Sequence, residues 1–153
     1  METALKTSGQ PVRRGTIAHD HEVYTMLADA AARQRDAAAL RQYAPEAARL
    51  AERDGHALYL AIARRALGVA ARLADGAGLA ESEAQLIRAL DGFRQIGARW
   101  QAGRTQCELG ELAQARSDTQ AARDHFTRAL AEFEALRAAP DAERARAALF
   151  AVG

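Results

Sequence analysis

The densest group of metal-capable side chains in the sequence is His19-Asp20-His21-Glu22. Zinc takes three or four ligands in tetrahedral reach. His19 and His21 straddle the expected start of a helix, so their side chains do not share a helical face. We therefore predict a solvated helix N-terminus here, with no bound metal and no cofactor.

The only cysteine is Cys107, so the chain cannot form an internal disulfide, and it has no Cys-x-x-Cys motif. A nucleophilic thiol needs a helix N-terminus or a nearby cation to lower its pKa. Cys107 is expected in the middle of a helix, which predicts a partly buried apolar role.

Paired carboxylates are the remaining candidates for acid–base chemistry. They fall on predicted helices and are interpreted as solvated faces: Glu81 with Glu83, Glu108 with Glu111, and Glu132 with Glu134. Without a nucleophile or a metal cluster, the chain is predicted not to be an enzyme.

Charge and hydropathy limit the classes of partner and the location that can be expected. The net charge is +1, so no global field attracts nucleic acid. Charged residues interrupt every apolar run, so no segment of about 18 residues is predicted to span a membrane. The opening METALKTSGQPVRRG lacks the apolar core of a signal peptide, and a cytoplasmic location is expected.

The elements that must position these residues are helices. Apolar residues make up 49% of the chain and alanine alone about a quarter, and alanine is the best helix former. Residues 1–18 show no helical period and are predicted to be a flexible N-terminal tail, and residues 19–153 are predicted to form one domain. The apolar periods predict helices over residues 20–35, 37–53, 57–74, 80–95, 100–116, 120–138 and 142–150.

Particular residues are expected to shape these helices. The first has a stripe at i, i+3, i+4, i+7 spacing that predicts its core-facing side: Val23, Met26, Leu27 and Ala30. Asp20 and Asp141 are placed to cap the first and seventh helices, and either Asp118 or Thr119 the sixth. Pro45 predicts a kink or a late start in the second helix.

The sequence repeats itself. Leu67-Gly68 recurs as Leu109-Gly110, and Leu86-x-x-Ala89-Leu90-x-x-Phe93 recurs as Phe126-x-x-Ala129-Leu130-x-x-Phe133. A glycine within a helix costs up to about 1 kcal/mol relative to alanine, so Gly68 and Gly110 predict close approach of a partner helix. The fold is therefore predicted to be all-α, with about three antiparallel hairpins stacked on one another and a terminal helix that caps them.

Leu109-Gly110, Ala122, Phe126 and Ala129 match the tetratricopeptide signature at its spacing, and the chain resembles that family. Its period of about 40 residues is longer than the usual 34 and is similar to the helical-repeat regions of bacterial MalT-like and LuxR-type signalling ATPases. The resemblance implies a right-handed stack and an interaction module. It implies no nucleotide site, since no G-x-x-x-x-G-K-[ST] occurs.

In tetratricopeptide arrays the first helices of successive hairpins line a concave groove that holds a peptide. Transferred to this chain, the groove residues are Glu22, Thr25, Asp29 and Arg33, then Arg65, Val69 and Arg72, then Arg104, Cys107, Glu111 and Gln114. Arginine offers bidentate donors for a carboxylate, so an acidic or C-terminal peptide is one expected ligand. Ordinary exposed arginines are the alternative. Trp100 is expected either to anchor the junction of the second and third hairpins or to contact a partner.

The function expected from these residues is a non-catalytic protein-interaction module in a bacterial signalling or transcription-control system. The alternative is a domain that senses a small effector in the same groove. The partner is expected to be a protein or peptide, and self-association into a homodimer stays open because a short stack leaves apolar ends.

Overall fold

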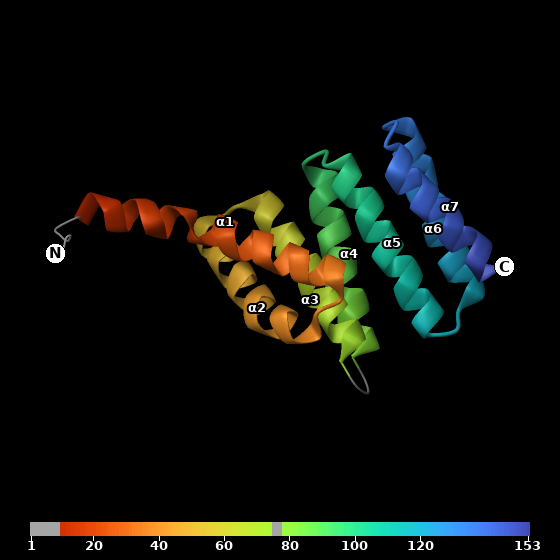
Figure 1. Cartoon of the computed structure of the whole chain (residues 1–153), viewed down its shortest axis with the longest axis horizontal. Helices are drawn as coiled ribbons and strands as arrows, with labels where there is room; N and C mark the ends of the chain where they lie inside the picture. Colours follow the sequence, from red (N-terminus) through yellow and green to blue (C-terminus); the bar gives the residue numbers. More distant parts are fainter. Residues whose placement is uncertain (1–9, 75–77) are drawn as a thin grey trace.

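The computed structural model describes residues 10–74 and 78–153, and within them it contains seven helices and no strands (Figure 1). The helices are α1 (Gln10–Gln34), α2 (Ala37–Asp54), α3 (Ala57–Leu73), α4 (Leu79–Gln95), α5 (Arg99–Ala115), α6 (Thr119–Ala135) and α7 (Ala139–Val152). In the described part of the chain, no helix has an apolar stretch long enough to cross a bilayer.

Neighbouring helices in the sequence pack side by side, and the first helices α1, α3 and α5 also contact one another in order. The hairpins α1–α2, α3–α4 and α5–α6 follow one another along the long axis, with α7 at the end away from the first hairpin (Figure 1). The core runs as a chain of five small clusters instead of one centre. The predicted all-α stack of hairpins is confirmed.

The turns repeat as regularly as the helices. One residue in each of five turns adopts a left-handed backbone with φ between 56° and 71°: Arg35, Gly55, Gly97, Ser117 and Arg137. In each case the N–H of the following residue bonds the carbonyl five residues before it, at 2.8–3.0 Å. This geometry ends a helix tightly and starts the next one almost at once.

Side chains cap three of the helices. Asp36, His56 and Asp118 accept hydrogen bonds from backbone N–H groups at the starts of α2, α3 and α6, and Asp118 was predicted to do so. The predicted cap at Asp141 is wrong, because α7 begins at Ala139 and Asp141 lies inside its first turn.

The first helix begins at Gln10 instead of Asp20, so Asp20 does not cap it. Residues 10–18, predicted as tail, belong to this helix, and Pro11 falls in its first turn, where proline leaves no intrahelical bond unmade. The rest of the predicted tail, residues 1–9, lies outside the described residues.

The predicted core face of α1 is also wrong. Val23, Met26 and Leu27 are 50%, 66% and 40% exposed, and Ala30 is exposed too. The buried side consists of small residues, Ala28, Ala31 and Ala32, which pack on the alanine-rich α2. Small side chains let two helix backbones approach closely, so here size outweighs hydrophobicity in selecting the buried face.

Pro45 lies within a continuous α2, so the predicted late start is wrong. Pro45 is exposed on the surface. Its ring leaves the carbonyl of Arg41 without its helical partner, and at the surface water can take that place.

The predicted close approach at the helical glycines is confirmed. A Cβ on Gly68 would lie 2.7 Å from Cγ of Leu86, and a Cβ on Gly110 would lie 2.6 Å from Cε1 of Phe126. Each contact joins the two helices of one hairpin, α3 with α4 and α5 with α6.

Candidate functional site

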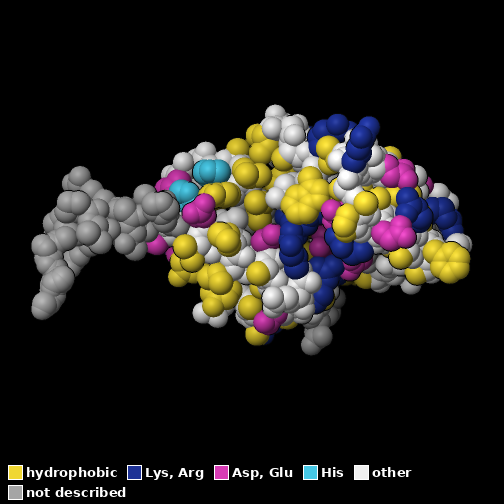
Figure 2. All heavy atoms as spheres, turned by 45° about the horizontal axis from the view of Figure 1, so that its top comes forward, with side chains coloured by type: hydrophobic (Ala, Val, Ile, Leu, Met, Phe, Trp, Pro, Cys, Tyr) yellow, Lys and Arg dark blue, Asp and Glu magenta, His cyan; other side chains and the backbone are white. Residues whose placement is uncertain are grey.

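A hollow of about 500 Å³ opens beside the first helices α1 and α5 and is here called the inner hollow. Its walls come from α1, α5, α6 and α7, and its residues are Arg33, Arg35, Trp100, Arg104, Cys107, Glu108, Glu111, Phe126, Phe133, Asp141, Arg144 and Ala148. Four of the predicted groove residues line it directly: Arg33, Arg104, Cys107 and Glu111. Figure 2 shows arginines and carboxylates interleaved at the centre of the visible face.

Asp29 of α1 is the meeting point of the predicted groove. Its Oδ1 accepts hydrogen bonds from Arg65 at 3.2 Å and from Arg104 at 3.0 Å, and its Oδ2 accepts one from Arg104 at 3.3 Å. Arg33 lies 3.6 Å away, one helical turn along. One carboxylate therefore binds α1, α3 and α5 together.

Burial alone would raise the pKa of Asp29. The hydrogen bond from Arg104 and the charges of Arg65, Arg104 and Arg33 outweigh burial and lower the pKa below 3.8. The guanidinium of Arg65 is fully enclosed, and burial lowers its pKa to about 10. Both groups stay charged at neutral pH. Arg65 was predicted to bind a ligand, but its side chain is buried and already paired with Asp29, so it links α3 to α1.

A second cluster joins the same three helices. Arg72 of α3 donates to Glu108 at 3.0 Å and to Glu111 at 3.3 Å. Arg35, in the turn after α1, donates to Glu108 at 3.0 Å and to Glu111 at 2.8 Å. The predicted solvated pair Glu108 and Glu111 is thus a bridge, and Glu108 is only 8% exposed.

The two clusters are unbalanced in charge. Three carboxylates, Asp29, Glu108 and Glu111, face five guanidinium groups, those of Arg33, Arg35, Arg65, Arg72 and Arg104. Each carboxylate already accepts from two or more arginines. The lining of the inner hollow itself has more guanidinium groups than carboxylates: Arg33, Arg35, Arg104 and Arg144 against Glu108, Glu111 and Asp141. Arg33 is the most exposed of the five arginines in the two clusters, with 54% of its side chain accessible.

Trp100 joins α5 to α7. Its indole N–H donates to Oδ2 of Asp141 at 2.9 Å, and the guanidinium groups of Arg33 and Arg104 lie 5.7 and 5.1 Å from its ring. The predicted junction between the second and third hairpins is wrong, because the tie runs onward to α7. The ring is 37% exposed in the inner hollow and keeps a face for contact.

Four other predicted groove residues do not line the inner hollow. Val69 and Thr25 are buried, Val69 within the core that α1, α2 and α3 share. Glu22 accepts a hydrogen bond from the hydroxyl of Tyr59 at 3.1 Å. Gln114 is exposed but lines a shallower hollow next to Arg72 and Leu73.

Cys107 lies half-buried at the wall of the inner hollow. Burial raises the pKa of its thiol to about 12, and the negative charges of Glu108 and Glu111 add to the rise. A thiol with this pKa is protonated at neutral pH and is a poor nucleophile.

Sequence reasoning missed Arg35 and Glu108 as members of the site. Arg35 lies in a turn, and helix registers do not predict the direction of a turn residue. The pair Glu108 and Glu111 was noticed as carboxylates, but its burial depends on Arg72 and Arg35, which are 36 or more residues away in the chain. No local signal carries such a contact.

His21, from the His19–Glu22 segment, pairs with a carboxylate of α2 and lies beside a second histidine. Nδ1 of His21 lies 2.5 Å from Oδ2 of Asp54, and the His21 ring centroid lies 5.4 Å from that of His56. The hydrogen bonds from Arg53 and from His21 lower the pKa of Asp54 to about 2. Among the described residues, no three His, Cys, Asp or Glu side chains converge on a point where a metal ion could bind.

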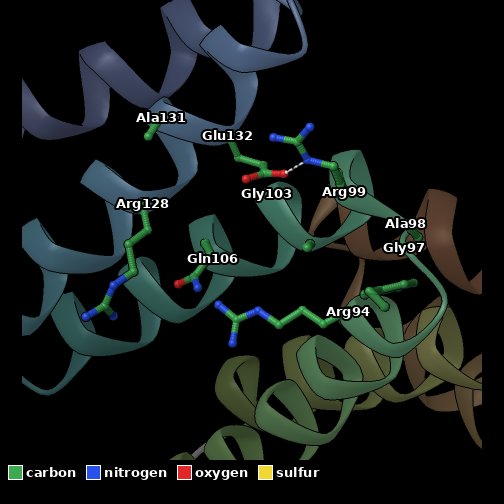
Figure 3. A pocket seen from close by; sticks show the side chains of 11 residues that line it. Arg94, Gly97, Ala98, Arg99, Gly103, Gln106, Arg128, Ala131 and Glu132 are labelled. Carbon is green, nitrogen blue, oxygen red and sulfur yellow. Dashed lines mark hydrogen bonds and ion pairs between the residues drawn. The ribbon is translucent and has the colours of Figure 1, made fainter.

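A second hollow of about 380 Å³, the outer hollow, lies between α4, α5 and α6. Figure 3 shows Arg94 of α4 extending toward Gln106, Arg128 of α6 at the side of the hollow, and Arg99 paired with Glu132. Nε of Arg99 donates to Oε2 of Glu132 at 2.5 Å. Nδ1 of His125 lies 2.8 Å from Oε1 of Gln106 and fixes the amide. This hollow was not predicted from the sequence.

No model of a known protein family matches the chain, and no curated protein matches it. The assignment of a helical-hairpin architecture rests on the structure of this chain alone.

Proposed function

We propose that this chain is a non-catalytic interaction module whose inner hollow receives an acidic segment of a partner protein. The observation that carries the proposal is the excess of positive charge in the lining of the hollow, where four guanidinium groups face three carboxylates. An incoming carboxylate would be attracted by the remaining positive charge and oriented by planar arginine donors.

The remaining features of the hollow fit a peptide ligand. Trp100 offers a partly exposed ring, and Arg144, with 71% of its side chain accessible, borders the hollow on α7. Aromatic and arginine side chains are the residue types that most often dominate protein interfaces. The high pKa of Cys107 leaves the hollow without a reactive thiol, in keeping with binding instead of chemistry.

The resemblance to tetratricopeptide repeats supports the same proposal. It extends to a cytoplasmic bacterial signalling or transcription-control system, in which modules of this kind recruit other proteins. Within that proposal, the ion-paired residues Asp29, Arg65 and Arg72 hold the first helices in place, and the exposed Arg33 and Arg144 contact the ligand.

Fluorescence anisotropy with labelled peptides tests the proposal. The probes are an eight-residue peptide rich in Glu and Asp and a peptide in which Gln and Asn replace every acid. We expect the acidic peptide to bind and the neutral one to bind at least about tenfold more weakly, since charge-assisted hydrogen bonds contribute about 1.5–3 kcal/mol. Equal affinity for the two peptides, or none for either, would contradict the proposal.

A matched pair of double variants locates the binding. Arg33→Glu with Arg144→Glu reverses charge at the inner hollow, and Arg41→Glu with Arg88→Glu makes the same change of net charge on exposed positions of α2 and α4. We expect only the first variant to lose the acidic peptide. If both lose it equally, the attraction comes from net charge and not from the hollow.

A second candidate function is the sensing of a small effector. The volumes of the two hollows, about 380 and 500 Å³, fall within the range typical of small-molecule sites. A thermal-shift screen of small anionic metabolites separates this candidate, because a ligand that binds the native state raises the melting temperature by mass action. A hit that is lost in the Arg33→Glu, Arg144→Glu variant would favour an effector in the inner hollow.

A further inference from the structure

We infer that α1 pairs with α1 of a second copy of this chain, antiparallel and about a two-fold axis. The starting observation is the exposed stripe formed by Val23, Met26, Leu27 and Ala30. These residues lie one above another on a single face of α1, on the side away from α2 and α3. Figure 2 shows hydrophobic side chains gathered over the half of the molecule nearer the N-terminus.

The internal repeat shows which residues of α5 occupy the positions equivalent to this stripe. Leu27 lies eight residues before the left-handed residue Arg35, and Leu109 lies eight residues before the left-handed Ser117. By the same count Ala30 corresponds to Leu112. The two leucines of α5 are buried against Leu86 and Leu90 of α4.

The same register holds in α3. Leu67 and Ala70, which precede and follow Gly68 as Leu109 and Leu112 do Gly110, pack on the core shared with α1 and α2. Both α3 and α5 therefore bury this face against the second helix of the hairpin before them, and that helix runs antiparallel to them. On α1 the same face is open, so an antiparallel helix is the shape that fits it.

The stripe is complementary to itself. An antiparallel pair centred between Met26 and Leu27 places Met26 opposite Leu27 of the second copy and Val23 opposite Ala30. It also places Asp20 and Arg33 at the same level at both ends, so that opposite charges flank the stripe, and Arg33 lies 3.6 Å from Asp29 of its own helix as well. A two-fold interface requires this kind of reciprocal match, in which one patch serves both copies.

Sedimentation velocity on the chain at increasing concentration tests the pairing. We expect the weight-average mass to rise from 16.4 kDa, the mass of one chain, toward twice that value between about 5 and about 500 µM, the range of a small interface. A mass that stays at 16.4 kDa over the whole range overturns the proposal.

A matched pair of variants tests the location. Leu27→Glu sets two glutamates near the axis and is expected to keep the chain monomeric at all these concentrations. Ile87→Glu makes a similar change on α4, where Ile87 is 44% exposed against 40% for Leu27, and is expected to dimerise as the parent does. A dimer that persists in the Leu27→Glu variant overturns the proposal, and circular dichroism confirms that both variants are folded.

A charge-exchange cycle at the half-buried Asp20 and the exposed Arg33 tests the antiparallel register. Asp20→Arg and Arg33→Asp each set like charges opposite each other at both ends, and each is expected to raise the dimer Kd by roughly 2- to 10-fold. The double variant restores opposite charges in reversed order and is expected to recover the parent Kd. If the two single effects simply multiply in the double variant, Asp20 and Arg33 do not meet and the proposed register is wrong.

Discussion

Gly110 of α5 and Phe126 of α6 are packed so tightly that a Cβ on the glycine would lie within 3 Å of three atoms of the aromatic ring. Gly103 and Phe133 repeat the relationship two turns earlier on α5, with a nearest distance of 2.7 Å. The rings fill the space that the missing side chains leave. The third hairpin is thus held by two glycines facing two phenylalanines.

The first prediction follows from this contact. Gly110→Ala gains up to about 1 kcal/mol of helix propensity, but it forces the Phe126 ring out of its place. Overpacking of this kind costs about 1–3 kcal/mol, so we expect a net loss in the free energy of unfolding, measured by urea denaturation. Gly92→Ala is the control, since it has the same gain in helix propensity but its added Cβ would meet only the Cβ of Ala61, at 3.2 Å, so it is expected to keep or raise the free energy of unfolding. Equal effects at the two positions would contradict the packing described for the hairpin.

Sequence reasoning succeeded where the signal is local and repeated. Gly68 and Gly110 recur with their leucines and predict the close helix pairs, and the phenylalanines of the other repeated pattern, on α4 and α6, are buried. It failed on α1, where the larger apolar residues were expected inside. Alanine is apolar but small, so hydrophobic periodicity alone does not distinguish an alanine face that packs closely from an aliphatic face that stays exposed.

The second prediction concerns the left-handed turns. Ser117 has φ of 59°, and a left-handed conformation costs a non-glycine residue roughly 1–2 kcal/mol. Ser117→Gly removes that strain and is expected to raise the free energy of unfolding by about 0.5–1 kcal/mol, after the greater flexibility of glycine in the unfolded chain is subtracted. The measurement is again urea denaturation.

Arg35→Gly provides the contrast within the same turn geometry. Arg35 has φ of 56°, but its side chain also bonds Glu108 and Glu111. Relief of backbone strain raises the free energy of unfolding, and loss of these ion pairs lowers it. Arg35→Gly should therefore raise the free energy of unfolding less than Ser117→Gly does, or lower it. A larger gain at Arg35 would mean that the ion pairs do not stabilise the fold.

The third prediction is a pH dependence carried by Asp29. The pKa of this carboxyl is lowered below 3.8 in the folded chain, so its ionised form stabilises the fold above that pH. The contribution is lost as the pH falls from 3.8 through the folded pKa. We expect Asp29→Asn to cost about 1–3 kcal/mol at pH 7, because it weakens charged hydrogen bonds to Arg65 and Arg104, and to cost progressively less below pH 3.8.

Glu134→Gln is the control for this experiment. Glu134 pairs with Arg146 at 2.9 Å, but both side chains are more than half exposed. Such a surface pair contributes about 0–1 kcal/mol. If the two substitutions have the same effect across the pH range, the Asp29 cluster does not join the three helices as described.

The inner hollow marks the limit of sequence reasoning for the site. The register of the first helices brought Arg33, Arg104, Cys107 and Glu111 to one hollow, because residues on equivalent faces of stacked hairpins meet. It could not show that Arg65 is only 1% exposed and already paired. The pairing depends on side-chain reach across three helices, which the spacing along one helix does not determine.

The fourth prediction concerns the reactivity of Cys107. Its thiol lies in the wall of the inner hollow, and burial, with the charges of Glu108 and Glu111, raises the pKa to about 12. Thiol reagents attack the thiolate, so at pH 8 the native chain should react with a disulfide reagent about 100-fold more slowly than the urea-unfolded chain. The rate of the native chain should rise steadily with pH up to 10, while the rate of the unfolded chain levels off above the ordinary thiol pKa of 9.0.

A control variant, Cys107→Ser with Ala84→Cys, moves the thiol to an exposed position on α4 and should react at the rate of the unfolded chain without urea. If native Cys107 reacts as fast as the cysteine at position 84, its thiol is not shielded. Neither burial nor the negative charges of Glu108 and Glu111 then raise its pKa as described.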